Sequence, residues 1–378
     1  MTLQDIVPKI ANLADAEREA GRPLRTLNAI QQAGYQLVKA RDTDHYYLAK
    51  TSELQPLLVK LGDIAEVRRG FTAGANEFFY LEPMGLRVAD IMAGKGGERV
   101  WVKNGAGWQG EIETAWLRPV IKSPRELQTL RVRPEDLRYL VFMPPDSVRD
   151  RLQDTAHLKR HSPCAWAYIQ WGEQRGYQNN PTMRARDTWY LLVPKESRIP
   201  ILRASADRPA FYFSDFQILH DQTFYSIYCE NRNMEKILAG ILNASFSNYL
   251  VREVSSGASS MLGQGALWSA VYETKDIRLP NPAAFTDEQR ERLLNAFEQM
   301  AGREVKSIFE ELGLPKPNRD YSNIRLEEVS LKRVLPDRRA LDEVVFEVLG
   351  LSESEQLAVY RGVVELVRNR LVKAQNVG

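Results

Sequence analysis

Long apolar runs are missing from this 378-residue chain. No stretch approaches the roughly 18 uncharged apolar residues that a membrane-spanning helix needs. The first 25 residues contain the acidic side chains of Asp5, Asp15, Glu17 and Glu19, which a secretory signal peptide would not carry. We therefore expect a cytoplasmic protein.

Cysteine and histidine are scarce. The two cysteines, Cys164 and Cys229, cannot make a disulfide framework or a four-cysteine zinc site, so we expect reduced thiols. His157 and His161 are spaced so that both could meet a zinc ion from one helix, with Cys164 as a third ligand. A fourth ligand would have to come from the remote Cys229 or His220. We therefore interpret this segment as a basic surface helix without a metal.

A large excess of charge of either sign is also absent, since 51 Lys and Arg face 49 Asp and Glu. The distribution is nevertheless uneven. Between Arg118 and Arg208 there are seventeen basic and ten acidic residues, so this stretch is expected to face a polyanion such as a phosphate backbone. Apolar residues make up 44% of the chain, which is enough for ordered cores and excludes a disordered chain.

The chain is longer than a usual single core, and its pattern predicts three parts. Residues 1–44 have apolar positions at three- to four-residue spacing and predict a helical lead-in. Residues 45–283 contain short β-branched and aromatic runs between glycines and prolines, which predict an irregular mixed sheet, and an amphipathic helix of about five turns at 234–254. Residues 284–378 predict helices, the first capped by Thr286. The expected fold class is α/β (α+β), with a mixed-sheet domain before a helical C-terminal unit.

Four segments carry a more specific pattern. They are LGDIAEVRRGFTAGANEFFYL at 61–81, WLRPVIKSPREL at 116–127, a helix with a glycine-rich stretch and a strand at 237–282, and RRALDEVVFEVLGLSESEQLAVYRGVVELV at 338–367. In this order they resemble the C-terminal, target-recognition half of adenine-N6 DNA methyltransferases of restriction-modification and phage-exclusion systems, including fused nuclease-methylase enzymes. The resemblance spans about residues 45 to 374. It implies that 45–283 is a target-recognition domain and that 284–378 is a helical C-terminal region.

The catalytic signatures of such methyltransferases are not matched. The family holds the flipped adenine with an Asn/Asp-Pro-Pro-Tyr/Phe motif. The nearest strings here, FMPPDS at 142–147 and NNPT at 179–182, lack that combination. The glycines of FTAGAN are not followed by an acidic residue at the end of a second strand, which ribose binding would need. We expect no methyl transfer and no cofactor in this chain, and S-adenosylmethionine in a catalytic partner.

The resemblance also implies that loops and strand ends approach double-stranded DNA. Arginine has the geometry to read guanine, and asparagine or glutamine to read adenine. The candidate DNA-binding residues are Arg68, Arg69, Thr72, Asn76, Lys122, Arg125, Arg175, Tyr177, Gln178, Asn179, Arg184, Arg186, Ser255, Ser256 and Gln264. Residues 175–186 interleave cations, amides and aromatics, and we interpret them as the specificity loop.

Two arginine pairs have different expected geometries. Arg68 and Arg69 are adjacent on a predicted strand and point to opposite faces, so one of them is expected to be a solvent or salt-bridge residue. Arg184 and Arg186 are two residues apart and share a face if the segment is extended. We interpret both members of the second pair as DNA contacts.

Aromatic residues and glycines in the same segments are expected to be structural. Trp189 and Tyr190 begin an apolar run and are interpreted as core residues. Gly70 and Gly74 are interpreted as turn formers rather than as points where a ligand approaches the backbone.

Different classes of function remain open. As a binding module, the chain would be a DNA specificity subunit or fragment whose partner is a catalytic methyltransferase subunit or domain. As an enzyme, it would be a complete adenine-N6 methyltransferase with unrecognised motifs. As an assembly factor, it would bind a methylase and not DNA. The acid-x-Lys triplets that begin at Glu273 and Glu304 match the pattern of a magnesium-dependent nuclease site. The first lies in a recognition segment and the second on a predicted charged helix, so we expect no nuclease site.

Overall fold

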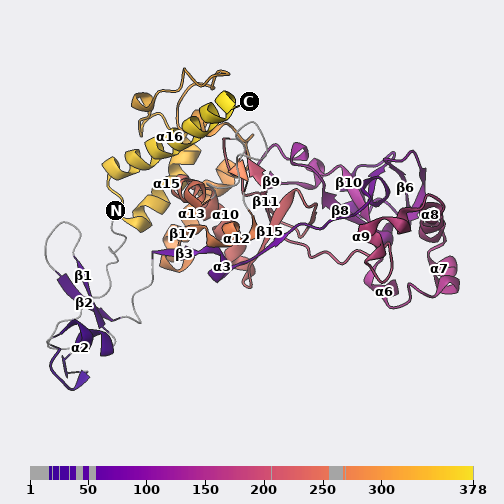
Figure 1. The fold of residues 1–378 in the computed structure, drawn as a ribbon, viewed down its shortest axis with the longest axis horizontal. Coiled ribbons are helices and arrows are strands. Elements are labelled where there is room, and N and C mark those ends of the chain that lie inside the picture. Colours follow the sequence, from indigo (N-terminus) through magenta and orange to yellow (C-terminus); the bar gives the residue numbers. More distant parts are fainter. Residues whose placement is uncertain are drawn as a thin grey trace.

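The computed structural model describes residues 17–377 with gaps at 19, 25, 34, 40–45, 51–56, 206, 255–266 and 269. Figure 1 shows an elongated molecule with a small lobe at one end, a helical body in the middle and a strand-rich lobe at the other end. This arrangement confirms the predicted mixed α/β class with a helical C-terminal region. Within the described residues, no helix combines the length and apolar character that a bilayer crossing needs.

The small lobe corrects part of the predicted helical lead-in. Its described elements are α2 (Leu27–Gln32) and the antiparallel strands β1 (Tyr35–Lys39) and β2 (Tyr46–Lys50). The helical spacing of apolar residues ends at Ala33, and the following segment begins with the buried aromatic Tyr35 and pairs with β2, so it forms a strand. The predicted part boundaries at 44 and 283 remain predictions.

The strand-rich lobe contains a six-stranded mixed sheet. Its order is β14 (Leu219–His220), β8 (Leu117–Ile121), β10 (Tyr139–Phe142), β5 (Tyr80–Pro83), β6 (Arg99–Asn104) and β7 (Gln109–Glu113). Neighbours are antiparallel except β14 and β8, which are parallel. The alternation of exposed and buried residues along β6 shows that one face of the sheet meets solvent.

Helix α8 (Pro163–Gln174) packs on β7 and brings aromatic rings onto the buried side of this sheet. Phe78 stacks on Tyr168 with ring centroids 4.6 Å apart, and the Tyr168 hydroxyl donates to the Phe78 carbonyl at 2.6 Å. Trp189 lies half-buried 4.9 Å from the same phenylalanine, and Tyr190 is buried. The prediction that Trp189 and Tyr190 are core residues is therefore confirmed.

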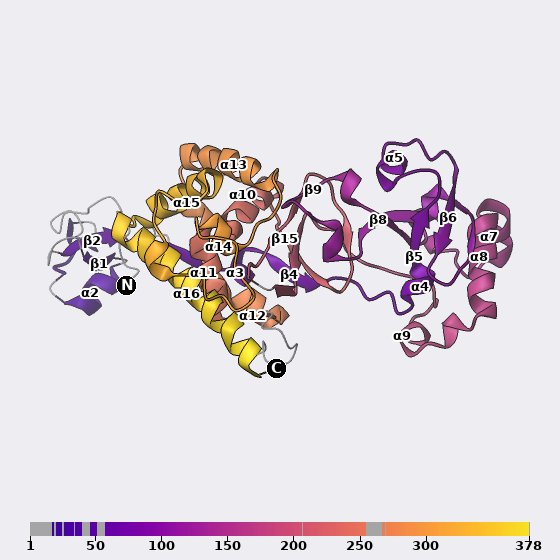
Figure 2. The same cartoon turned by 90° about the horizontal axis from the view of Figure 1, so that it is seen from above.

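A three-stranded sheet joins the strand-rich lobe to the helical body (Figure 2). It contains β11 (Ile199–Leu202), β15 (Phe224–Tyr228) and β4 (Glu66–Arg69), all antiparallel. On the side of the helical body, β4 is preceded by α3 (Leu61–Ile64) and lies near α12 (Val271–Asp276), and β3 (Leu58–Lys60) pairs with β17 (Arg278–Pro280).

The helical body contains α10 (Arg232–Asn243), α11 (Ser245–Val254), α13 (Asp287–Ala301), α15 (Pro336–Leu349) and α16 (Glu353–Val377). Figure 2 shows α16 running along this body. The predicted capping box is confirmed, because the Thr286 side chain accepts from the Gln289 backbone N–H.

The single helix predicted at 234–254 is wrong, because the chain breaks at Ala244, whose backbone is extended. The buried carboxylate of Asp342 accepts hydrogen bonds from the Ser245 N–H at 2.7 Å and from its hydroxyl at 2.6 Å. A distant side chain therefore starts α11 as a new helix, which apolar spacing alone does not reveal.

A buried ion cluster centred on Glu311 holds the helical body together. Glu311 and Arg338 have no exposed side-chain surface, and Arg338 Nη2 lies 2.5 Å from Glu311 Oε2. Arg208, next to the strand-rich region, also pairs with Glu311, and Arg303 Nη1 approaches at 2.9 Å. Burial alone would raise the pKa of Glu311, but the three guanidinium groups outweigh it and lower the pKa to about 2.

Glu311→Gln is expected to destabilise the protein by about 3–5 kcal/mol, because it removes the carboxylate that pairs with the buried guanidinium groups of Arg208 and Arg338. Chemical denaturation of the variant and the parent measures this difference. The matched control is Glu347→Gln, which breaks the exposed Arg292–Glu347 pair and is expected to cost less than about 1 kcal/mol. Equal losses in the two variants would contradict the role given to Glu311.

The same cluster predicts a dependence on pH. Because the folded-state pKa of Glu311 is lowered, its contribution is complete above the ordinary carboxyl range near 4.5 and is lost as the pH falls toward about 2. The stability difference between the parent and Glu311→Gln should therefore shrink over this window in denaturation experiments at graded pH. A difference in stability that stays constant down to about pH 2 would refute the lowered pKa of Glu311.

Candidate nucleic-acid interface

The candidate interface is built around a tight turn between β14 and β15. The Phe224 N–H donates to the Asp221 carbonyl at 3.0 Å, which closes the turn with Gln222 at its tip. The buried Asp221 carboxylate accepts from the Thr223 N–H at 3.0 Å and from the Tyr80 hydroxyl at 2.5 Å. The turn is therefore fastened to strand β5 of the large sheet through a side chain that water does not reach.

Residues 70–74, which we call the glycine segment, follow β4 and pack directly on this turn. The Gly70 N–H donates to the Phe224 carbonyl at 2.9 Å, and the Phe71 N–H to the His220 carbonyl at 3.0 Å. A Cβ on Gly70 would overlap the carbonyl oxygen of Asp221. Gly70 is thus required for a close approach of two backbones, which corrects its interpretation as a turn former. Gly74 has a φ of +90° and confirms that interpretation for its own position.

Two segments predicted to bind DNA meet at the tip of the turn, together with Arg203. Arg69 Nη2 donates to Gln222 Oε1 at 2.8 Å, and Thr72 Oγ1 donates to the same oxygen at 3.1 Å. Arg203 Nη1 donates to the Gln222 backbone carbonyl at 3.2 Å. On the other side, the Thr223 hydroxyl donates to the Lys122 carbonyl at 3.4 Å. We call the surface formed by Arg69, Thr72, Lys122, Arg203 and Gln222 the turn surface.

Aromatic rings support the cations of the turn surface. Arg69 lies opposite Tyr225 in the β4–β15 register, and the Arg203 guanidinium lies 5.8 Å from the same ring. The Lys122 ammonium lies 4.2 Å from the Tyr139 ring and 5.1 Å from the Tyr80 ring. These contacts hold positive charges at the surface without neutralising them.

The adjacent arginines of β4 turn to different partners, as strand alternation predicts. Arg69 contacts the turn, whereas Arg68 Nε lies 2.5 Å from Glu66 Oε1. Glu66 is also paired with Lys195 at 2.9 Å, and hydrogen bonds from Lys195 and Arg68 lower its pKa. Arg68 is therefore part of an exposed ion-pair group, and Arg69 is the member of the pair that belongs to the turn surface.

The expected specificity loop is not extended. Residues Tyr177–Asn179 form the 3₁₀ turn η5 and Pro181–Arg184 form α9, so Arg184 and Arg186 do not share a strand face. Proline at the first position of α9 favours the helical turn over a strand. Arg184 is exposed, with no side-chain hydrogen bond or ion pair in the described part of the chain. It remains available to a partner.

Arg186 instead holds the glycine segment in place. Its Nη2 donates to the carbonyls of Thr72 at 3.0 Å and Ala73 at 2.8 Å, and its Nη1 donates to the Trp189 carbonyl at 3.2 Å. Partial burial lowers the pKa of this guanidinium. Arg186 therefore joins two loops, and its contact with DNA stays a prediction.

Other predicted residues of the specificity loop also have structural partners. Tyr177 is buried, and its hydroxyl donates to Glu77 at 2.7 Å, so its ring is not available for stacking on a base. The Gln178 side-chain amide donates to the Glu173 carbonyl at 3.1 Å. Arg175 is exposed, with its guanidinium 5.6 Å from the Trp171 ring.

The remaining predicted residues divide into exposed ones and ones outside the described chain. Asn76 at the start of α4 (Asn76–Phe79) is exposed, as are Asn179 and Arg125, and the last of these lies in the 3₁₀ turn η3 (Pro124–Glu126). Ser255, Ser256 and Gln264 lie outside the described residues.

Sequence reasoning missed Gln222, Arg203 and Asp221. The string Asp-Gln-Thr contains a usable signal, since an aspartate that accepts the N–H two residues later is typical of a tight turn. The contacts of Arg203 and Gln222 with residues far along the chain have no such local signal. His220, beside the turn, is buried, its Nδ1 lies 2.7 Å from Ser226 Oγ, and burial lowers its pKa to about 3.

The histidine pair has no metal-site geometry around it. The His157 and His161 rings stack at 4.3 Å on α7 (Thr155–His161), with His157 half-buried and His161 exposed. Among the described residues, no three His, Cys, Asp or Glu side chains gather as metal ligands would.

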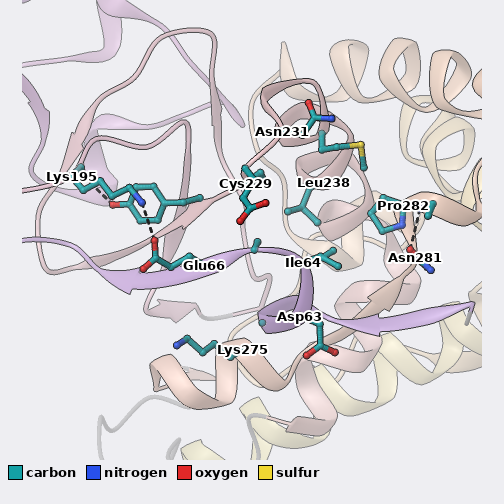
Figure 3. A pocket seen from close by; sticks show the side chains of 16 residues that line it. Asp63, Ile64, Glu66, Lys195, Cys229, Asn231, Leu238, Lys275, Asn281 and Pro282 are labelled. Carbon is teal, nitrogen blue, oxygen red and sulfur yellow. Dashed lines mark hydrogen bonds and ion pairs between the residues drawn. The ribbon is translucent and has the colours of Figure 1, made fainter.

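An open pocket of about 900 Å³ lies between β4 and the start of α10. Figure 3 shows the Glu66–Lys195 pair on one side of it and Leu238 and Pro282 on the other. Its lining carries charges of both signs, so it does not offer a consistent field to a polyanion. Burial raises the pKa of the lining thiol of Cys229 to about 11, which keeps it protonated near neutral pH.

Comparison with known proteins gives a family and two solved structures. The model of the family "Type II methyltransferase M.Eco57I, C-terminal domain" matches residues 114–311, more than half of the chain. The type IIG restriction endonuclease BpuSI aligns with a TM-score of 0.43 at 11% identity, over 79% of this chain and 32% of that one. The Type IIL restriction-modification enzyme MmeI, solved in complex with DNA, aligns with a TM-score of 0.43 at 12% identity, over 89% of this chain and 41% of that one.

The chain therefore spans about a third of the length of BpuSI and about two fifths of that of MmeI. A sequence search of curated proteins finds no match.

Arg186→Met is expected to lower the free energy of unfolding by about 1–3 kcal/mol, because it leaves the Thr72 and Ala73 carbonyls without their donor. The matched control is Arg184→Met, which removes an exposed arginine and should change stability by no more than about 0.5 kcal/mol. Denaturant titration measures both. Equal effects would show that Arg186 does not join the two loops.

Proposed function

Because this chain belongs to the family of the C-terminal domain of the Type II methyltransferase M.Eco57I, we propose that it recognises a DNA sequence for an adenine-N6 methyltransferase. It is the specificity subunit or fragment of a restriction-modification or phage-defence system. It positions double-stranded DNA for base flipping and methylation by a separate catalytic part. Its partners are the DNA and the catalytic methyltransferase subunit or domain.

The observation that carries this proposal is the turn surface. Arg69 contacts the side-chain amide of Gln222, Arg203 contacts the backbone carbonyl of the same residue, and the Lys122 backbone accepts from the adjacent Thr223, so residues from three separate strands or strand ends meet at one turn. Cations supply the affinity for phosphates, and an amide supplies hydrogen bonds that depend on base identity. A surface that combines both on a rigid turn has the chemistry required to read a duplex.

The proline pair nearest to a catalytic motif supports a division of labour between this chain and a catalytic partner. The proline pair is Pro144 and Pro145 in the string FMPPDS at 142–147. The aromatic residue of this string, Phe142, is buried in β10, and its ring stacks on the Trp116 ring with centroids 5.2 Å apart. Pro144 and Pro145 are buried as well. A flipped adenine needs an open aromatic face beside the motif, and this ring is already covered. We therefore propose that the S-adenosylmethionine site lies in the catalytic partner.

The proposal predicts DNA binding that weakens steeply with salt. Each phosphate contact should contribute a slope of about −0.9 to the dependence of log affinity on log salt, measured by fluorescence anisotropy between about 50 and 200 mM. Arg203→Met should make the slope shallower by about 1. The control is Arg99→Met, which removes an exposed arginine from β6 at the far side of the sheet and should leave the slope unchanged.

Calorimetric titration with S-adenosylmethionine should give no binding heat. A clear heat would make the chain a methyltransferase with an unrecognised site and overturn the division of labour. Binding of a methylase without any affinity for DNA would replace the proposal with an assembly role.

A further inference from the structure

We propose that Gln222 reads a guanine in the major groove through the two N–H donors of its side-chain amide. This inference rests on the proposed function, and it names the residue and the base to which the turn surface is matched. The inference follows from which atoms of the Gln222 amide already make hydrogen bonds within the protein.

The orientation of the amide is fixed by its neighbours. Arginine has donors and no acceptor, so the Gln222 atom 2.8 Å from Arg69 Nη2 must be the oxygen. The Thr72 hydroxyl donates to the same oxygen at 3.1 Å. An amide oxygen has two lone pairs. Both are therefore engaged within the protein.

The opposite end of the amide is unoccupied. Within the described residues, Gln222 Nε2 has no hydrogen-bond partner, and the contacts of its oxygen lie at the surface. The side chain thus presents two donors and no free acceptor to an approaching ligand. This differs from the usual pairing of glutamine with adenine, which needs the amide oxygen to accept from the adenine N6 amino group.

Base edges in the major groove differ in how well they fit such a donor pair. Guanine offers two acceptors, N7 and O6, whereas adenine offers one acceptor beside a donor, and cytosine presents its N4 donor. Thymine has a single acceptor next to a methyl group. Guanine is therefore the base that satisfies both N–H groups of Gln222, and cytosine is the least compatible.

The turn holds this donor pair in place before DNA arrives. The backbone at Gln222 is fixed by the Asp221 hydrogen bonds to Thr223 and Tyr80 and by the Arg203 contact with the Gln222 carbonyl. An immobilised side chain loses less conformational entropy on binding. The neighbouring cations of Arg69 and Arg203 attract the phosphates that flank the base.

The test is selection from a pool of randomised DNA duplexes by the full chain at low salt, followed by sequencing. The parent should enrich a motif that contains a guanine at one position. Gln222→Glu keeps an oxygen for Arg69 but replaces the donors with acceptors. It should lose that guanine preference by about 10-fold or more and favour cytosine there, while other positions keep their preferences. Gln222→Ala should lose the preference without gaining another.

The matched control is Gln109→Glu, which adds the same charge on β7, at the sheet edge opposite β14. It should leave the selected motif unchanged. If the parent selects a motif and Gln222→Glu alters no position, the inference fails and the proposed function stands. If the parent selects no motif, the proposed function fails, and the inference fails with it. Thermal melting of each variant shows whether a change in motif comes from misfolding.

Discussion

The buried carboxylate of Asp221 is the interaction on which the candidate interface depends. It joins a surface turn to the large sheet through Tyr80, and it stiffens the turn through the Thr223 N–H. Burial, together with the neighbouring carboxylate, raises the pKa of Tyr80, which favours the protonated hydroxyl that donates to Asp221. The half-buried Gln222 side chain at the tip therefore stands on a turn that is fixed by the hydrogen bonds of a buried carboxylate.

Glu311 plays a comparable part in the helical body. A buried carboxylate that meets three guanidinium groups, two of them from remote parts of the chain, is costly to desolvate and favourable only when every partner is in place. Arg208 lies between β11 and β15 of the joining sheet in the sequence, whereas Arg338 lies on α15. The cluster thus couples the register of the strands to the packing of the helices. The two carboxylates act at different ends of one continuous core.

The parts of this arrangement that were predicted from the sequence are those that depend on near neighbours. The Thr286 capping box, the core position of Tyr190 and the different partners of Arg68 and Arg69 follow from spacing of a few residues. The break at Ala244 and the role of Gly70 depend on contacts with residues far along the chain. A sequence does not reveal such contacts without the fold, because the same letters are compatible with many partners.

The same reasoning applies to the expected specificity loop at residues 175–186, which contains short helical turns in place of an extended strand. Arg186 and Tyr177 have the chemistry of DNA-binding residues, but their donors are satisfied inside the protein. Gln222 is different because other residues fix its backbone, among them Asp221 and Arg203. Within the described residues, only the oxygen end of its own side-chain amide accepts hydrogen bonds from the protein. Under the proposed function, a change of side chain at this tip therefore alters the base preference and leaves the turn intact. Affinity and specificity are separable on such a surface, since surrounding cations supply the first and a single anchored side chain supplies the second.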